Sequence, residues 1–133
     1  MSRPIRRIAP LLVAGLLSAG LAVPASSQAA TTCKLSVRKS QSLGPTYVVT
    51  SRTSGRPGYR VTKTSCATGL RVVKAFHTCR LKHGKKGRCT TRVLGYSCTD
   101  KRDPDLASAL SFDGDVVCRR GDARVTHHYT QNL

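Results

Sequence analysis

The side chains best placed to do chemistry are basic residues gathered between two cysteines, at residues 79–89. This segment combines two glycines with five Lys or Arg residues, a composition typical of an exposed loop. A disulfide between its ends would order the loop in advance, and an ordered loop loses less entropy when it binds a partner. We therefore expect an anion-binding loop, and its candidate residues are Lys82, Lys85, Lys86 and Arg88.

Metal binding would need a different use of the same region. Structural zinc is bound by closely spaced pairs of ligands, roughly two to four residues apart. Cys79 and Cys89 are too far apart in sequence for such a pair. We therefore predict no metal and no cofactor. The side chains that could be drawn as a zinc set are His77, Cys79, His83, Cys89 and Cys98.

Catalytic patterns are weak. The sequence contains no Gly-x-Ser-x-Gly turn for a serine nucleophile. Cleavage by two histidines requires both imidazoles to face one substrate, and the adjacent His127 and His128 would point to opposite faces of a strand. Either could still combine with His77 or His83, so an enzyme acting on an anionic substrate stays as the second alternative function.

The acidic residues are all aspartates, and they indicate little chemistry. Asp113 and Asp115 would share a strand face, and Asp103 and Asp105 flank Pro104. Glycoside cleavage needs two carboxyl groups about 5 to 10 Å apart across a cleft. An EF-hand calcium loop needs a glycine and a terminal glutamate, which are missing here. We expect these aspartates to be solvated turn and strand residues.

Charge is distributed unevenly along the chain. The formal net charge is +17, and residues 30–99 contain 15 Lys or Arg residues and no acidic residue. Residues 100–133 contain five basic residues and six Asp. Such a surface attracts polyanions at long range. The expected partner is an anionic component of the cell envelope or another anionic polymer, bound without catalysis.

Three other interpretations of this charge stay open or are disfavoured. Sequence-specific binding of nucleic acid is not expected, because no recognition motif occurs and no aromatic residues alternate with the basic loop. A basic surface that only keeps the protein soluble is the simplest alternative. The first functional alternative is an inhibitor or protein-interaction module that inserts the loop at residues 79–89 into a partner's cleft.

The first residues have the features of an export signal. Three arginines precede an uncharged apolar run at residues 8–23, and small residues follow at Ser27 and Ala29. The run is shorter than the ~20 residues that span a bilayer, and no other segment is apolar enough. We predict a signal peptide at residues 1–29 and a single secreted, disulfide-rich domain at residues 30–133, without a transmembrane segment. The Sec and twin-arginine export routes both stay open.

All six cysteines lie in residues 30–133, and an even number in a small exported domain predicts a disulfide framework. A hairpin folded symmetrically about residues 101–110 would place Cys98 near Asp113 rather than near Cys118. Several long-range pairings are compatible with this arrangement. The predicted disulfides are Cys79–Cys89, Cys66–Cys98 and Cys33–Cys118.

The periodicity of apolar residues predicts the elements that position these side chains. Helical spacing runs through residues 66–78, after Thr64 and Ser65, either of which can cap a helix. Gly69 within this helix predicts a close approach to a sheet. Strands are predicted at residues 31–39, 46–50, 59–63, 90–99, 113–118 and 124–130. The predicted fold class is α+β, with one helix packed on a mostly antiparallel, disulfide-stabilised sheet of about four to six strands.

Three short motifs resemble those of a group of small exported actinobacterial proteins. They are Ser65-Cys66 at the helix start, Gly95-Tyr96-Ser97-Cys98 in a strand, and Val117-Cys118-Arg119-Arg120-Gly121 before a final strand. The similarity extends over residues 65–129, about half of the chain. It implies export and a shared fold. Because the group has no established activity, it implies no functional residue.

Overall fold

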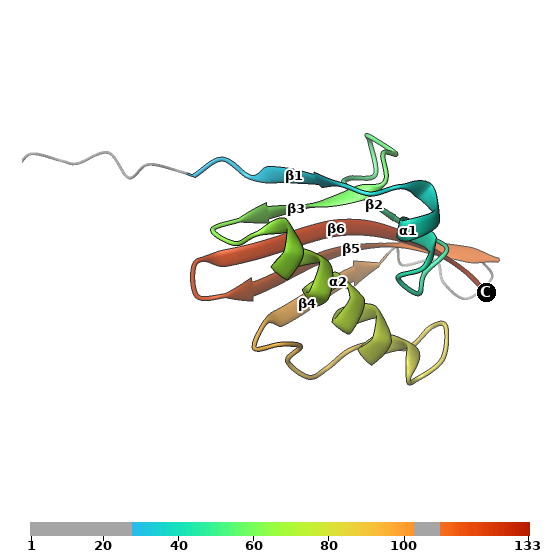
Figure 1. Cartoon of the computed structure of the whole chain (residues 1–133). Helices are drawn as coiled ribbons and strands as arrows, with labels where there is room; N and C mark the ends of the chain where they lie inside the picture. Colours follow the sequence, from blue (N-terminus) through green and yellow to red (C-terminus); the bar gives the residue numbers. More distant parts are fainter. Residues whose placement is uncertain (1–27, 103–109) are drawn as a thin grey trace, which may run out of the picture.

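The computed structural model describes residues 28–102 and 110–133, in which six strands form one antiparallel sheet with the order β1-β3-β6-β5-β4 and with β2 beside β6 (Figure 1). The predicted α+β class is confirmed. Almost all of the predicted signal peptide, and also Asp103 and Asp105, lie outside the described residues. The elements are β1 (Thr31–Lys34), α1 (Val37–Gln41), β2 (Tyr47–Val49), β3 (Gly58–Thr62), α2 (Cys66–Leu81), β4 (Ser97–Arg102), β5 (Ser111–Arg120) and β6 (Ala123–Asn132).

The two longest strands, β5 and β6, form the centre of the sheet. They are joined by a two-residue turn at Gly121 and Asp122. On its other edge β6 pairs first with β3 and then with β2. Neighbouring side chains of a strand point to opposite faces, and His127 accordingly lies in the core while His128 lies on the opposite face with Asp113 and Asp115.

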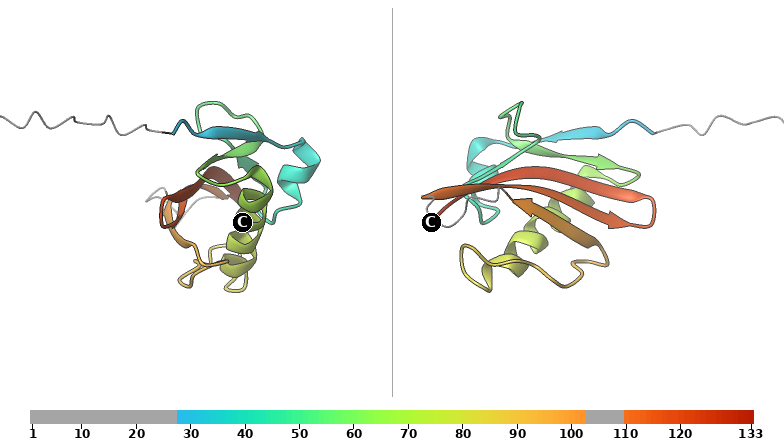
Figure 2. Two further views of the ribbon diagram at one scale, coloured as in Figure 1. Left: turned by 60° about the vertical axis from the view of Figure 1, so that its left-hand side comes forward. Right: turned by 180° about the vertical axis from the view of Figure 1, so that it is seen from behind.

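Helix α2 covers one face of the sheet, and the strands lie in front of it when the molecule is seen from behind (Figure 2). Its first turn is capped by Ser65, whose hydroxyl accepts a hydrogen bond from the Thr68 amide at 3.1 Å. A β-carbon on Gly69 would lie 2.6 Å from Val61 Cγ1, which confirms the close approach predicted at this glycine. The helix ends at Leu81, about one turn later than expected. Its buried residues are Gly69, Val72, Val73, Phe76, His77 and Arg80.

The strand predicted at residues 31–39 is too long. Strand β1 ends at Lys34, and the chain turns into the short helix α1, where the Ser36 hydroxyl accepts a hydrogen bond from the Lys39 amide. Ser40 is fully buried in α1 because its hydroxyl bridges the carbonyl and the amide of Val48 in β2. Alternating polarity alone cannot show such a bridge.

The strand predicted at residues 90–99 begins only at Ser97 and continues to Arg102. The reason is a tight turn in which Val93 and Tyr96 exchange two backbone hydrogen bonds of 2.9 Å. The two residues between them have positive φ angles, a conformation in which a strand cannot continue.

Three disulfides link the elements, and one of them is the predicted Cys79–Cys89 bond. The other two predicted pairings are wrong, because Cys33 is bonded to Cys66 and Cys98 to Cys118. The hairpin of β4 and β5 is not symmetric about residues 101–110. Arg102 pairs with Gly114, and this register places Cys98 directly opposite Cys118. The first residues of β5 pair with β6 alone.

The bond between Cys33 and Cys66 ties the edge of the sheet to the start of α2. Cys33 lies opposite Tyr59 of β3, and the Tyr59 hydroxyl donates a hydrogen bond to the carbonyl of Cys66. Strand β3 therefore brings the two cysteines together.

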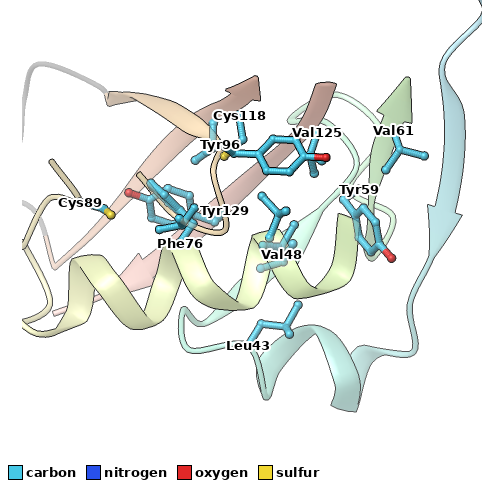
Figure 3. Close-up of a cluster of buried hydrophobic side chains, with 14 of the residues drawn as sticks. Leu43, Val48, Tyr59, Val61, Phe76, Cys89, Tyr96, Cys118, Val125 and Tyr129 are labelled. Atoms are coloured by element: carbon cyan, nitrogen blue, oxygen red, sulfur yellow. The ribbon is translucent and has the colours of Figure 1, made fainter. Parts of the chain in front are cut away.

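The apolar core fills the space between α2 and the sheet. Phe76 of α2, Val48 of β2 and Tyr129 of β6 have no exposed surface, and they lie together in this layer (Figure 3). Within residues 28–102 and 110–133, no helix is both long and apolar enough to cross a membrane.

Candidate anion-binding site

The outer face of α2 carries a row of polar side chains. Arg71, Lys74, Thr78 and Lys82 follow one another at spacings of three or four residues, which places them on one side of the helix. All four are exposed. The row borders the segment at residues 90–96, which returns along the helix after the loop.

A hollow of about 470 Å³ lies between this row and the returning segment. Its cationic groups are Arg71, Lys74 and Lys82 from the helix side and Arg92 from the segment. No carboxylate of the described residues lines it. The remaining lining residues, which are mostly apolar, are Ala75, Thr78, Cys79, Thr91, Val93 and Leu94. The hollow therefore combines a positive rim with an apolar floor.

The turn at residues 93–96 forms one wall of the hollow and is rigidly held. Tyr96 is fully buried, and the Arg120 guanidinium lies 4.7 Å from the centre of its ring and donates a hydrogen bond to the Leu94 carbonyl. Leu94 has φ +50° and Gly95 has φ +79°. The first of these conformations costs an L-residue such as leucine roughly 1 kcal/mol. The Leu94 side chain is nevertheless 46% exposed.

The structure places the four predicted site residues in two groups. Lys82 lies in the hollow beside Arg71 and Lys74. Lys85 and Lys86 are exposed on the following loop, and the Arg88 side chain donates a hydrogen bond of 2.9 Å to the carbonyl of Asp100. We call the combined set the basic surface. Its members are Arg71, Lys74, Lys82, Lys85, Lys86, Arg88 and Arg92.

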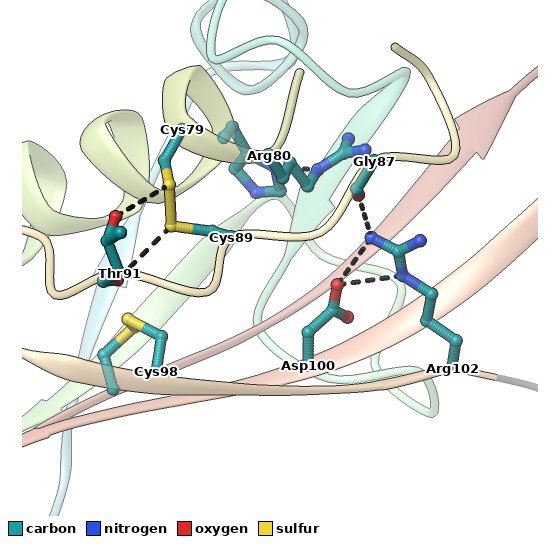
Figure 4. Close-up of a disulfide and its surroundings, with 10 residues drawn as sticks. Cys79, Arg80, Gly87, Cys89, Thr91, Cys98, Asp100 and Arg102 are labelled. Carbon is teal, nitrogen blue, oxygen red and sulfur yellow. Dashed lines mark hydrogen bonds and ion pairs between the residues drawn. A yellow bond between two sulfur atoms is a disulfide. The ribbon is translucent and has the colours of Figure 1, made fainter. Parts of the chain in front are cut away.

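The loop of the basic surface is held by more than its disulfide. Arg80 donates a hydrogen bond of 3.0 Å to the carbonyl of Lys85. Arg102 donates to the carbonyls of Lys86 and Gly87, and it also forms an ion pair of 2.7 Å with the buried Asp100 (Figure 4). Three successive carbonyls are thus bound from the protein side, which fixes the backbone that carries the lysines.

Arg80 itself belongs to a buried polar network under the loop. Its Nε donates to His77 Nδ1 at 2.8 Å and its Nη2 donates to Gln131 Oε1 at 2.6 Å. The guanidinium lies 4.5 Å from the centre of the Tyr129 ring. Burial lowers the pKa of Arg80 and also raises the pKa of Tyr129. The network joins α2, β6 and the loop.

The proton positions in this network follow from Arg80, which can only donate. Nδ1 of His77 must accept, so neutral His77 carries its proton on Nε2 and donates it to Nε2 of His127, 2.9 Å away. His127 then carries its proton on Nδ1, for which the described residues supply no hydrogen-bond partner. Burial, together with the Arg80 charge, lowers the pKa of His127 to about 3, and burial lowers the pKa of His77 well below its ordinary value. Both imidazoles are shielded from solvent, so this pair is structural.

His128 lies on the opposite face of the sheet, at a second hollow of about 420 Å³. Its Nδ1 is 3.0 Å from Asp115 Oδ1, and its Nε2 is 3.6 Å from Asp113 Oδ1. Asp113 also accepts a hydrogen bond from the Thr130 hydroxyl, and Asp115 lies 3.6 Å from Arg52. Both ring nitrogens of His128 therefore face partners within the protein.

None of the described carboxylates lines the hollow. The Asp100 side chain is buried against Arg102. Asp113 and Asp115 belong to the opposite face with His128, and Asp122 forms an ion pair of 2.8 Å with Lys63 at the β5–β6 turn. Arg71, Lys74, Lys82 and Arg92 therefore line the hollow with no described carboxylate beside them.

The side chains that could be drawn as a zinc set do not come together as metal ligands. Cys79, Cys89 and Cys98 are all bonded to other cysteines. His77 is buried against His127, whereas His83 is exposed. Within the two described ranges no group of His, Cys, Asp and Glu side chains is arranged to hold a metal ion.

Sequence reasoning found Lys82 and the loop but missed Arg71, Lys74 and Arg92. The helical spacing from Arg71 to Lys82 would have shown that they share a face. No local signal could have placed Arg92 opposite them, because its position depends on the turn at residues 93–96. Comparisons of this chain with protein families, with curated proteins and with solved structures found no match.

Proposed function

We propose that this protein is secreted and binds an anionic polymer or another anionic component of the cell envelope through its basic surface, without catalysing a reaction. The observation that carries the proposal is the gathering of cationic side chains on α2, the pinned loop and the returning segment, four of which line a hollow that contains no described carboxylate. Export is supported by the signal-like residues 1–29 and by three disulfides, which persist in oxidising compartments.

The energetics of such binding come mainly from released counterions. Each phosphate neutralised on a duplex polyanion contributes about 0.9 to the slope of log affinity against log salt concentration. Pinning of the loop helps, because the backbone carrying Lys85 and Lys86 is already ordered before binding.

The test compares two variants that lose the same charge from opposite faces. The first changes the four cations of the hollow to serine, at Arg71, Lys74, Lys82 and Arg92. The control changes four exposed cations of the sheet, at Arg60, Lys101, Arg119 and Arg124. With a duplex DNA as a polyanion probe, the first variant should flatten the salt slope by up to about 3.6, or ~0.9 for each of the four cations. The control should change it much less. Equal effects of the two variants would show that binding is diffuse, and no binding by the wild type would contradict the proposal.

The pinned loop also supports a second candidate, insertion into a partner's cleft. Three carbonyls of this loop accept hydrogen bonds from Arg80 and Arg102, so the loop is ordered before it binds. Like the binding loops of interaction modules, it would lose little conformational entropy on binding. Insertion would depend on the shape of the loop more than on its charge. Capture of a protein from the culture fluid by the wild type should then persist at high salt, where polyanion binding is lost, and insertion is contradicted if that capture is lost at high salt.

A further inference from the structure

We propose that the anionic partner of the basic surface is a lipid bilayer, with one anionic headgroup in the hollow and the Leu94 side chain inserted between the lipids. This inference rests on the proposed function, because it names the kind of surface that the cations meet. It adds an apolar contact that a soluble polyanion would not need.

The first observation is the chemistry of the hollow. Arg71, Lys74, Lys82 and Arg92 offer charge to a phosphate group, while the floor at Ala75 and Val93 is apolar. The volume of about 470 Å³ lies within the range of small-molecule sites. A headgroup phosphate joined to a glycerol and acyl chains has the same division into an anionic and an apolar part.

The second observation is Leu94 itself. Two-residue turns with positive φ at both positions usually contain Asn-Gly or Asp-Gly. Here a leucine takes the first position and exposes nearly half of its side chain at the rim of the hollow. The turn is braced by Arg120 and by the buried Tyr96, so the exposed side chain is held in place and does not simply reflect a mobile loop.

A bilayer accounts for the two observations together. Protein segments that lie at a membrane interface combine Lys and Arg, which attract anionic headgroups, with leucine or aromatic side chains that enter the acyl boundary. The cationic row of α2 and Leu94 make this combination across two elements of the fold. A soluble polyanion would be bound by the same cations but would gain nothing from Leu94.

The experiment measures binding to vesicles and to heparin side by side. The vesicles contain phosphatidylcholine with phosphatidylglycerol, and vesicles of phosphatidylcholine alone are the reference. The key variant is Leu94→Asn, because asparagine suits the positive φ at this position and so keeps the turn. Its matched control is Leu133→Asn, which makes the same substitution at a part-exposed leucine outside the hollow.

We expect the wild type to bind the anionic vesicles and not the neutral ones. Leu94→Asn should weaken vesicle binding about five-fold, since half of the leucine is already covered before insertion, and should leave heparin binding unchanged. Leu133→Asn should leave both unchanged. The serine variant at Arg71, Lys74, Lys82 and Arg92 should weaken both.

Each other outcome has a definite meaning. Heparin binding without vesicle binding would overturn the lipid inference and leave the proposed function standing. Vesicle binding that is unaffected by Leu94→Asn would overturn the insertion of this side chain. Binding of neither probe by the wild type would overturn the proposed function as well.

Discussion

The two halves of the buried face of α2 differ in kind. In the first half Gly69, Val72 and Val73 pack among apolar groups, with Val61 of β3 directly against Gly69. In the second half Phe76 is still apolar, but His77 and Arg80 are buried polar side chains, which are bound by hydrogen bonds to groups of β6 and the loop. The core thus changes from apolar to polar along one helix.

The two halves of the buried face of α2 contribute differently to the protein. The apolar half joins helix to sheet and contributes stability alone. Burying a guanidinium is costly even when it is well bonded, and apolar replacements of whole buried ion networks are often neutral or stabilising. The polar half contains such a buried guanidinium, and Arg80 donates a hydrogen bond to the Lys85 carbonyl of the loop. Its role is therefore to hold in place the loop that carries the lysines.

The substitution with the largest expected effect on stability is Arg80→Met. The substitution keeps much of the side-chain length but leaves His77 Nδ1, Gln131 Oε1 and the Lys85 carbonyl without their donor. We expect the free energy of unfolding to fall by about 4 kcal/mol. The loop should also be released, so trypsin should cleave after Lys85 or Lys86 faster than in the wild type. Thermal unfolding and timed digestion measure the two effects.

The control for this variant lies on the same helix. Arg71→Met removes an arginine from the exposed face, where the change in stability should stay within about 0.5 kcal/mol. If both variants unfold at the same temperature, the buried network does not support the fold in the way described.

The next test uses pH, because only the polar half contains titratable groups with strongly lowered pKa values. The pKa of His127 is lowered to about 3 and that of His77 is also well below 6.5, so the folded state binds fewer protons than the unfolded state at mildly acidic pH. Stability is therefore full above about pH 7 and falls as the pH drops through 6.5 toward 3. Between pH 7 and 5.5 the two imidazoles should together lower the free energy of unfolding by roughly 2 kcal/mol.

Denaturant titrations at several pH values would measure this slope. His127→Gln keeps an acceptor for His77 Nε2 and should remove about half of the pH dependence in that range. Thr78→Ala on the exposed face of α2 removes no titratable group and should leave the slope unchanged. A wild-type stability that is flat from pH 7 to 5.5 would contradict the assignment of neutral imidazoles.

The apolar half is tested by Gly69→Ala. In an open helix this change usually gains about 1 kcal/mol. Here the new β-carbon would lie 2.6 Å from Val61 and 2.8 Å from the Tyr59 ring, so the helix or the sheet must shift. We expect a net loss of about 1.5 kcal/mol, with the pH dependence unchanged. Thr78→Ala on the exposed face should leave the free energy of unfolding nearly unchanged. If Gly69→Ala instead stabilises the protein, Val61 and Tyr59 move aside at little cost in free energy.

Local patterns predicted much of this architecture because they have local causes. The stripe at residues 66–78, the capping Ser65 and the close approach at Gly69 follow from helix geometry and are confirmed. The bond between Cys79 and Cys89 follows from their short separation in the chain. The bond between Cys98 and Cys118 depends on which residues of β4 and β5 pair, and the bond between Cys33 and Cys66 depends on the pairing of β1 with β3.

The candidate site divides in the same way. The charge of the loop could be predicted from composition, and the row on α2 could be predicted from spacing. The bond from Arg80 to Gln131 could not, because Gln131 lies 51 residues further along the chain and meets Arg80 only across the packed layers. The hollow could not be predicted either, because the turn at residues 93–96, which interrupts the predicted strand, places Arg92 beside α2.

The substitution with the smallest expected effect is at Leu94, an exposed residue of the turn at residues 93–96. Leu94 has a φ of +50°, a conformation that asparagine adopts more easily than leucine. Leu94→Asn should therefore raise the free energy of unfolding by about 1 kcal/mol, measured by denaturant titration. Gly95→Ala at the next position, where φ is +79° and the new β-carbon would lie 3.2 Å from the Arg120 side chain, should lower it by a similar amount. If Leu94→Asn raises the free energy of unfolding and Gly95→Ala lowers it, the strained backbone conformation of the turn lies at Leu94 and not at Gly95. If Leu94→Asn instead destabilises the protein, the leucine packs against the fold, and its exposure is no argument for a partner.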